Sequence, residues 1–294
     1  MNWKTLLEDR IKAPIGEEFY VGGAGASDSK SGRIALEPFL KLATALAHCK
    51  SGRHDVIWVQ DYWENDTFPV VIEKTNVHII GLMTRQPAAW PIMNAGAHAC
   101  FSIGEAAGGG MCCEISGLSM ITDATHPCID VVSLYTQIWI HNCAFGEHGI
   151  AQDGIYAPGF SAELGWSVIE DNIFGKELVR DGIRVYAPTW TDIKNNRFNE
   201  YGGVGINFFC DVPDAQGGWI IGNRFFKSIG AAAGWAITMD KVAAAKIDDN
   251  RAMESGVAPQ HNPYKDTSTG VPGTTKNGWG ANWSGGVTVM PDVS

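Results

Sequence analysis

Apolar residues recur in the central part of the chain at intervals of 24 to 27 residues. Four segments align on asparagines at 172, 196, 223 and 250: SVIEDNIF, TDIKNNRF, GWIIGNRF and AAKIDDNR. An isoleucine stands three positions before each asparagine, and a phenylalanine stands two positions after the first three. This period is too short for a βαβ unit and fits one turn of a solenoid made of short strands and tight corners.

The repeat predicts ladders of identical side chains, because strands of neighbouring turns lie about 4.8 Å apart. The isoleucines are expected to fill the interior, the phenylalanines to stack beside them, and the asparagines to bond along a turn. IWIHNCAF, around Asn142, is a looser copy, and VHIIGLM and CCEISGLSM are degenerate ones. These ladders are interpreted as architecture, with no chemical role.

The two ends of the chain lack the repeat. An apolar helix is expected over residues 35–49, with Leu36, Phe39, Leu40, Leu42 and Leu46 on its buried side, covering the first turn of the solenoid. The glycine loop before it lacks the GxGxxG spacing of a nucleotide site. Beyond residue 255, Gly, Thr, Asn and Pro dominate. We therefore expect a cap over 1–54, the solenoid over 55–254, and an extended tail packed on it over 255–294.

The N-terminal part carries a series of short motifs. They are Phe19-Tyr20-Val21, Gly25, Asp28-Ser29, Gly32, Ala45-Leu46, Ser51-Gly52, Val56-Ile57 and Tyr62. In these positions the chain resembles the right-handed parallel β-helix proteins of the pectate-lyase-like superfamily, including phage tail-spike and appendage proteins. The resemblance covers roughly residues 19 to 254. It implies an all-β fold, a single-stranded right-handed parallel β-helix with an N-terminal capping helix, in a group that includes lyases, hydrolases, adhesins and inert spikes.

Composition agrees with this fold class and limits the partners. The chain has 35 glycines and only 18% charged residues, which favours a turn-dense β protein. Its formal charge of −10 disfavours nucleic acid and gives no attraction to anionic membranes. No apolar run is long enough to span a membrane. The start, MNWKTLLEDRIK, lacks a secretory signal, so we expect synthesis in the cytoplasm or assembly into a virion.

The seven cysteines, at 49, 100, 112, 113, 128, 143 and 210, include no CxxC pair. Most stand beside apolar residues in strand-like stretches, so we interpret them as small buried hydrophobes. No HExxH motif is present either. A structural zinc site is therefore not expected, and no cofactor is required by the sequence.

A second repeat predicts a column of aspartate side chains. QDGIYAPG and RDGIRVYAP give Asp153 and Asp181 the same local setting, and CIDVV adds Asp130 one turn earlier. Three carboxylates in one column would raise at least one pKa or recruit a cation. They could form a glycosidase pair, or Asp153 and Asp181 could hold Ca²⁺ beside an acidic sugar, with Arg184 or Arg180 as the base of a lyase. Alternatively, each DGI begins a strand, with the aspartate capping the turn and the glycine at positive φ.

Further candidates lie near this column. His148, in Gly146-Glu147-His148-Gly149, resembles the histidine motif of polygalacturonases, although the NTD and RIK motifs of that family are missing. The sequence has eleven tryptophans, and outward aromatic side chains can stack on the apolar faces of sugars. The residues expected to contact a glycan are Trp139, Trp166, Tyr186, Trp190 and Tyr156.

These features, with the resemblance, favour a phage-type virion appendage that binds cell-surface polysaccharide and cleaves it if the aspartates are catalytic. A virion appendage of this kind would be expected to form a homotrimer and to contact other virion proteins. The alternatives are a free-standing polysaccharide lyase or glycoside hydrolase, and a structural decoration protein without a ligand.

Overall fold

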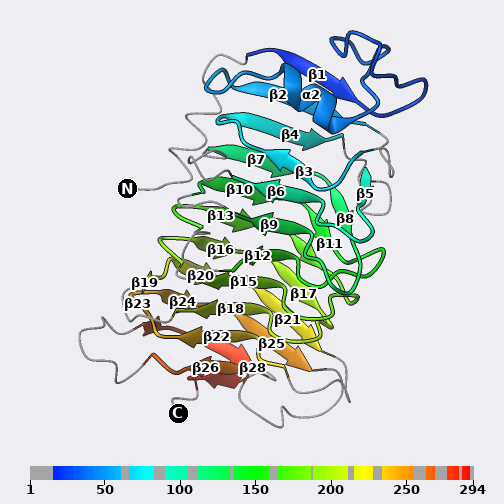
Figure 1. Ribbon diagram of the computed structural model, residues 1–294. Coiled ribbons are helices and arrows are strands. Elements are labelled where there is room, and N and C mark those ends of the chain that lie inside the picture. Colours follow the sequence, from blue (N-terminus) through cyan, green and yellow to red (C-terminus); the bar gives the residue numbers. More distant parts are fainter. Residues whose placement is uncertain are drawn as a thin grey trace.

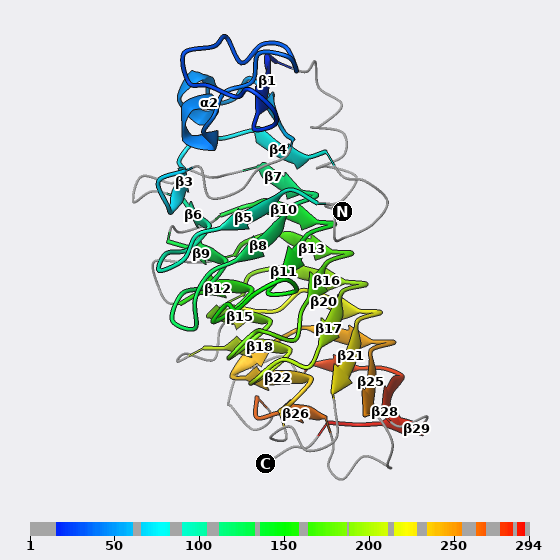
Figure 2. The ribbon, with the colours of Figure 1, turned by 90° about the vertical axis from the view of Figure 1, so that its right-hand side faces the viewer.

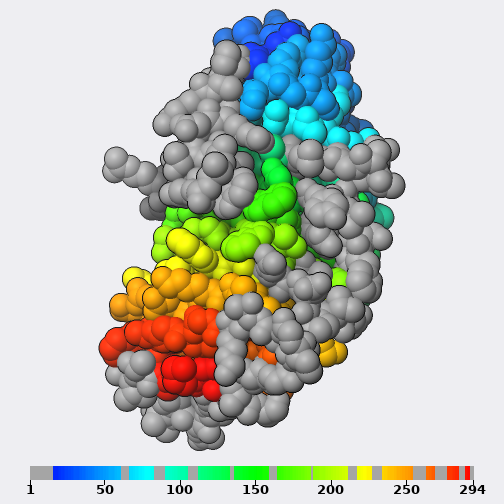
Figure 3. All heavy atoms as spheres, turned by 90° about the vertical axis from the view of Figure 1, so that its left-hand side faces the viewer, coloured from blue at the N-terminus to red at the C-terminus, as the bar shows by residue number. Residues whose placement is uncertain are grey.

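The computed structural model describes residues 16–60, 66–82, 90–104, 112–132, 136–158, 164–186, 188–210, 215–227, 234–254, 263–268, 277–284 and 287–291. These residues form a parallel β-solenoid with one short helix, α2 (Leu42–His48). Three long sheets run along its axis (Figure 1, Figure 2). In the space-filling view of Figure 3, the chain progresses along the long axis from the blue N-terminal end to the red C-terminal end.

Between residues 77 and 266 each turn of the chain contributes one strand to each sheet, and the described residues on either side add further strands. The ten-stranded sheet contains β1 (Glu18–Val21), β2 (Asp55–Val59), β4 (Val77–Gly81), β7 (Cys113–Ser116), β10 (Ile138–His141), β13 (Val168–Glu170), β16 (Asp192–Lys194), β20 (Trp219–Ile221), β24 (Lys246–Asp248) and β27 (Gly278–Trp279). The nine-stranded sheet contains β5 (Ile92–Asn94), β8 (Ser119–Ile121), β11 (Ala144–Phe145), β14 (Ile173–Phe174), β17 (Arg197–Asn199), β21 (Arg224–Lys227), β25 (Arg251–Glu254), β28 (Asn282–Ser284) and β29 (Val287–Val289).

The eight-stranded sheet contains β3 (Val70–Ile72), β6 (Phe101–Ile103), β9 (Ile129–Val131), β12 (Ile155–Ala157), β15 (Ile183–Tyr186), β18 (Ile206–Phe209), β22 (Ile237–Asp240) and β26 (Tyr264–Asp266). A short pair, β19 (Ala215–Gln216) and β23 (Val242–Ala243), lies apart from these sheets. The strand pairs are parallel, except that β29 runs antiparallel to β28. The mostly-β fold is therefore the expected solenoid.

The predicted interior ladders are confirmed. Isoleucines 140, 169, 193, 220 and 247 pair in register across five strands of the ten-stranded sheet, and all are fully buried. The rings of Phe145, Phe174, Phe198 and Phe225 stack with centroids 4.5 to 4.8 Å apart. Identical side chains occupy these columns because each turn presents the same position to the same interior space.

The asparagine ladder is confirmed as well. The side-chain oxygen of Asn196 accepts hydrogen bonds from the backbone N and the Nδ2 of Asn172, both at 3.0 Å. The same pattern links Asn196 to Asn223 and Asn223 to Asn250. The ladder satisfies buried backbone N–H groups at a corner where the sheets themselves cannot.

The looser copy differs from the expectation. Ile140 pairs with Ile169 and Phe145 with Phe174, so Cys143 occupies the ladder position of Asn172. Asn142 lies one position earlier, at a corner with φ of +51°. The equivalent corner residues Asp171, Asn195 and Asp249 are also left-handed, which suits Asn and Asp because their short side chains tolerate this conformation.

The helix is shorter than the predicted 35–49. Pro38 lies inside that range, and a proline removes a helical hydrogen bond and disfavours helix in the residue before it. Phe39 instead bridges Val21 of β1, and its backbone N donates to the oxygen of Tyr20 at 2.8 Å. Phe39, Leu42 and Leu46 are buried as expected, but Leu36 is 85% exposed. Within the described residues, no helix is long and apolar enough to cross a bilayer.

The sheets extend past the expected boundaries at 54 and 254. β1 pairs with β2, and β26, β27 and β28 continue the three sheets beyond the last repeat. Tyr264 pairs with Ile237, and Trp279 pairs with Ile247. Backbone pairing thus continues after the repeated side chains are replaced by aromatic ones. The division into cap, solenoid and tail stays a prediction, and residues 1–15 and Tyr62 lie outside the described residues.

Candidate functional site

The outer face of the eight-stranded sheet carries a column of polar side chains. These side chains alternate with buried ones such as Ile206 and Phe208, so they point away from the interior. From turn to turn the register gives Ser102, Asp130, Tyr156, Arg184, Asn207, Thr238 and Lys265. Unlike the interior ladders, this column changes its residue type at each step.

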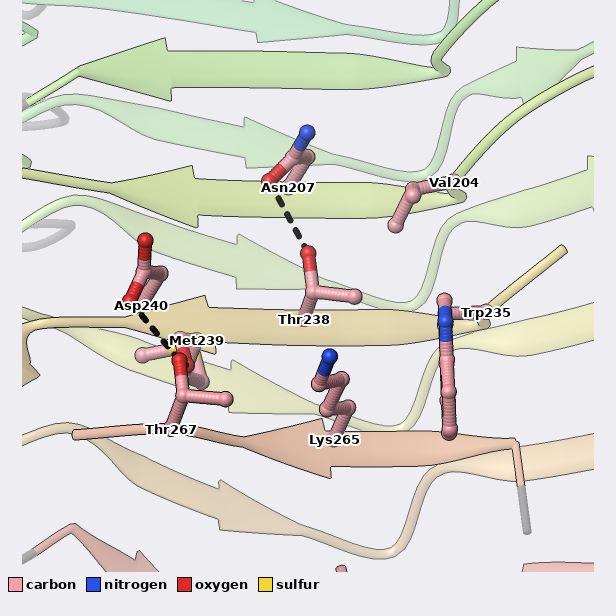
Figure 4. Close-up of a pocket in the computed structure, with 8 residues that line it drawn as sticks. All are labelled: Val204, Asn207, Trp235, Thr238, Met239, Asp240, Lys265 and Thr267. Atoms are coloured by element: carbon pink, nitrogen blue, oxygen red, sulfur yellow. Dashed lines mark hydrogen bonds between the residues drawn. The ribbon is translucent and has the colours of Figure 1, made fainter. Parts of the chain in front are cut away.

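Towards the C-terminal end of the solenoid, this face contains a hollow of about 450 Å³. Strands β18, β22 and β26 and the residues beside them supply its walls (Figure 4). Its lining residues are Val204, Asn207, Trp235, Thr238, Met239, Asp240, Lys265 and Thr267. A hollow of this size is within the range of pockets that hold small ligands.

Hydrogen bonds order the polar groups of the hollow. The Oγ1 of Thr238 donates to the Oδ1 of Asn207 at 2.9 Å, and the Oγ1 of Thr267 donates to the Oδ1 of Asp240 at 2.7 Å (Figure 4). Asn207 in turn donates from Nδ2 to Asp181 at 3.0 Å. Asn207 and Asp240 are therefore held by neighbours in the next turn, a preorganisation that suits binding of hydroxyl groups.

Lys265 is the cation of the hollow. Its Nζ lies 5.7 Å from the centre of the Trp235 ring, a cation–π distance. Across the described ranges, Lys265 makes no ion pair. The hollow thus combines an aromatic ring, an ammonium group, a carboxylate and hydroxyl groups, which together can bind a polar ring-shaped ligand.

The predicted equivalence of Asp153 and Asp181 is confirmed, since each stands two residues before the paired Ile155 and Ile183. Asp153 is fully buried, accepting hydrogen bonds from Arg180 Nε (2.9 Å), from Arg180 Nη2 and from the backbone N of Asp181 (3.0 Å). Asp181 accepts from the backbone N of Val204 at 2.8 Å. Burial raises the pKa of Asp153, and the hydrogen bonds from Arg180 oppose that rise.

The glycines after these aspartates differ from the expectation of positive φ, since neither Gly154 nor Gly182 is left-handed. Glycine is required there for space. A Cβ at Gly182 would lie 2.6 Å from the oxygen of Gly205 and 2.6 Å from the ring of Phe198. The DGI sequence is therefore a corner before a strand. Its aspartate accepts a hydrogen bond from a backbone N–H of the following turn of the solenoid, and its glycine makes room for the phenylalanine ladder.

Asp130 does not share the column of Asp153 and Asp181, contrary to the expectation. It pairs with Tyr156, three positions beyond Asp153, because CIDVV has its aspartate inside the strand and DGI has it before the strand. Its Oδ1 is buried and has no hydrogen-bond partner among the described residues. Burial raises the pKa of Asp130, and the charge of His126 partly opposes this.

The carboxylates as arranged do not resemble a calcium site. Both oxygens of Asp153 face N–H donors, and so do those of Asp181. Calcium prefers free carboxylate and carbonyl oxygens. Among the described residues, no group of three or more His, Cys, Asp or Glu side chains has the arrangement of a metal site. Calcium binding by Asp153 and Asp181 stays a prediction.

The two candidate arginines contact aromatic rings. Arg180 lies over Tyr156 at 4.9 Å, in addition to its ion pair with Asp153. Arg184 lies over Phe209 at 5.1 Å, with its Nη1 3.8 Å from Asp181. In the part of the chain that the structure describes, the buried Nε of Arg184 has no hydrogen-bond partner. Both guanidinium groups therefore lie on the same sheet face as the hollow.

The predicted glycan-contacting aromatics are divided among different parts of the molecule. Tyr156 and Tyr186 belong to the eight-stranded sheet, and Tyr186 is buried. Trp139 lies on the ten-stranded sheet and donates from Nε1 to Glu170 at 3.1 Å. Trp166 and Trp190 occupy left-handed corners before that sheet, and Trp190 is 41% exposed. The five therefore do not form one surface.

The histidines are also divided. His148 is exposed and follows β11 of the nine-stranded sheet. His141 belongs to a separate cluster on the ten-stranded sheet, where Glu114 bonds His141 at 2.8 Å and His78 at 2.9 Å. Burial raises the pKa of Glu114, but the hydrogen bonds from His141 and His78 outweigh it and lower that pKa to about 2.

The residues of the hollow were missed by sequence reasoning. Asn207, Thr238 and Lys265 each follow a buried strand residue: Ile206, Ile237 and Tyr264. Aligning those three buried positions would have put the polar residues in one column. The spacing is irregular there, and Lys265 lies in the segment expected to be a tail, so the signal was weak.

The cysteines agree with their interpretation as small hydrophobes. None of the seven forms a disulfide within the described residues, and six of them are buried. Burial raises the pKa of Cys49, Cys113 and Cys143 to about 12. Thiols with such pKa values remain protonated and poorly reactive at neutral pH.

The sequence matches no known protein family and no curated protein. Among solved structures, the fold is similar to that of a GH136 lacto-N-biosidase from Eubacterium ramulus, with a TM-score of 0.49 and 10% sequence identity. The match covers 96% of this chain and 56% of the other, so the chain spans little more than half of that structure. At this identity and score, the likeness assigns neither a family nor an activity.

Proposed function

We propose that this protein binds polysaccharide on the outer face of its eight-stranded sheet, with one sugar unit in the hollow. The observation that carries the proposal is the hollow of about 450 Å³, with Trp235 and Lys265 beside a set of ordered polar groups. Trp235 would stack on the apolar face of a sugar ring, while Asn207 and Asp240 would bond its hydroxyl groups. Neighbouring units would extend along the column towards Tyr156.

Binding to a panel of neutral and acidic polysaccharides, measured by affinity electrophoresis and calorimetry, tests this proposal. Trp235→Ala should weaken binding about tenfold or more, which corresponds to roughly 1.4 kcal/mol. The matched control is Trp219→Ala, because Trp219 is half-exposed on the ten-stranded sheet. No binding across the panel, or equal losses in the two variants, would overturn the proposal.

Cleavage of the bound chain is the second part of the proposal. The candidate catalytic residues remain Asp153, Asp181, Asp130, His148 and Arg184. New reducing ends without unsaturated product would support a hydrolase, and unsaturated product that depends on calcium would support a lyase. Asp153→Asn and Asp181→Asn must be compared at equal folded fraction, because both aspartates are buried in turn contacts.

We also propose the finer features that the resemblance implies: a right-handed coil, as parallel crossovers usually are, and a helix that caps the first turn. The burial of Leu42, Ala45 and Leu46 against β1, β2 and β3 supports the capping role.

The virion-appendage setting predicts a trimer in solution. Light scattering tests it, and a stable monomer would favour a free-standing protein.

A further inference from the structure

Three arginines stand in one column on the outer face of the nine-stranded sheet. Arg197 of β17 pairs with Arg224 of β21, and Arg224 pairs with Arg251 of β25. Neighbouring strands lie about 4.8 Å apart, so one guanidinium group follows the next at each turn. All three residues are exposed. We call Arg197, Arg224 and Arg251 the arginine strip.

The arginine strip is poorly neutralised by the residues that the structure describes. Among them, the carboxylate of Asp249 lies 3.5 Å from Nη2 of Arg251. Arg197 donates from Nε to the amide oxygen of Asn199 at 2.9 Å, which leaves its charge unbalanced. Within the described part of the chain, the side chain of Arg224 makes no ion pair or hydrogen bond.

Such a column is unfavourable for the protein alone. Like charges directly opposite each other on neighbouring strands destabilise a sheet. The chain as a whole carries 32 acidic and 22 basic residues, so a basic surface is not its general character. An anionic partner along the column would remove the repulsion and explain why three cations stand together.

The surroundings of the strip indicate what kind of anion fits. Trp283 follows Arg251 in the same column and is 38% exposed, and Met253, two residues after Arg251 on β25, is 47% exposed. The guanidinium group of Arg197 also lies over Phe226 at 5.1 Å. Guanidinium groups bind carboxylates in a bidentate manner, and a flat aromatic side chain can stack on a sugar ring. One cation per turn in a straight line suits an extended polymer with an anion on its successive units.

We propose that the arginine strip binds the carboxylates of a linear acidic polysaccharide, with Trp283 stacking on one of its sugar rings. The proposal rests on the proposed function in taking a carbohydrate as the polymer, but it uses a different sheet and different residues. The hollow would bind the ligand by ring stacking and hydroxyl contacts, whereas the strip would select its charge.

The test uses the full chain and three probes: polygalacturonate, alginate and neutral pullulan. Arg224→Gln with Arg251→Gln should weaken binding to the acidic polymers about tenfold or more, leave pullulan binding unchanged, and reduce the dependence of affinity on salt. The matched control is Lys176→Gln with Lys246→Gln, which removes the same charge from exposed lysines elsewhere. An equal loss in the control would overturn the proposal, because net charge alone would then explain binding.

Further outcomes of these binding measurements distinguish the arginine strip from the hollow. If Trp235→Ala abolishes binding of all polymers while the arginine variants bind normally, the hollow is supported and the strip is overturned. A wild-type protein that binds neither acidic polymer, or that prefers a single-stranded oligonucleotide of equal charge, would also overturn it. The arginine variants should unfold about 1 °C higher than wild type at low salt, since repulsion is relieved, which shows that they are folded.

Discussion

The inner and outer sides of the solenoid wall follow opposite rules. Inside, one residue type repeats from turn to turn, as in the stacked rings of Phe174, Phe198 and Phe225. Outside, on the eight-stranded sheet, the column runs from Asp130 through Arg184 to Lys265 with a new residue type at each turn. The interior repeats because every turn fills the same space, whereas outer positions are free to vary.

This difference shows where to look for function in such a fold. A ladder residue has the same partners in every turn, so its identity reports packing. An outer residue is adjacent to different neighbours at each turn, so a binding surface can be built only there. The arginine strip is an exception, since one residue type repeats there on the outer side. Packing does not explain this repetition, because neighbouring like charges lower the stability of a sheet.

The largest effect should come from the centre of the ring stack. Phe198→Ala removes a fully buried ring between Phe174 and Phe225 and leaves a cavity, which should lower the free energy of unfolding by about 4 kcal/mol. Urea unfolding followed by circular dichroism measures it. Phe226→Ala, on the outer side, is the control and should cost about 1 kcal/mol. Similar losses for both variants would contradict the difference between the inner and outer sides of the wall.

A buried carboxylate on the ten-stranded sheet should make stability depend on acid pH. The pKa of Glu114 is lowered from 4.5 to about 2, so its ionised form stabilises the fold above pH 4.5, and this stability is lost as the pH falls towards 2. The loss is on the order of 3 kcal/mol. Glu114→Gln should therefore flatten this part of the pH profile, measured by urea unfolding between pH 5 and 2.5.

The control for this profile is Asp123→Asn. The pKa of Asp123 is also lowered to about 2, by hydrogen bonds from His126 and Thr125, but its carboxylate is exposed to water. Solvent screens such surface pairs, so this variant should change the profile much less. An unchanged profile in Glu114→Gln would mean that the cluster with His78 and His141 adds nothing to stability.

The asparagine ladder should give the next largest effect. Asn196→Ala deletes the side chain that accepts from Asn172 and donates to Asn223, leaving buried polar groups unpaired. We expect a loss of about 2 kcal/mol in urea unfolding. Asn199→Ala, at the surface beside Arg197, should cost less than about 0.5 kcal/mol. A loss below 1 kcal/mol at Asn196 would contradict the structural role of the ladder.

The smallest effect is expected at an outer aromatic. Trp190 is a bulky residue with φ of +53°, so Trp190→Gly relieves backbone strain while removing a side chain that is 41% exposed. The two effects oppose each other, and the free energy of unfolding should change by less than about 0.5 kcal/mol. A loss above 2 kcal/mol would show that Trp190 belongs to the interior.

Parts of the fold and site followed from the sequence to different degrees. The ladders were predictable because a fixed period forces equivalent positions to align. The helix limits were wrong at Leu36, since its segment pairs with β1 through Phe39. Asp130 was put in the wrong column, because its distance from Asp153 resembles the repeat while its position relative to the strand differs by three residues. The hollow was missed altogether.

The solenoid, its three interior ladders and the equivalence of Asp153 and Asp181 all follow from the amino-acid sequence. These depend on local repetition, and hydrogen bonding between strands turns a period along the chain into a column in space. Arg197, Arg224 and Arg251 each come directly after a ladder asparagine, so their column also follows from the repeat. The position of Lys265 beside Trp235, in contrast, follows only from the packing of the whole chain. Irregular corners shift the register by a few residues per turn, and one residue of shift exchanges the inner and outer faces of a strand.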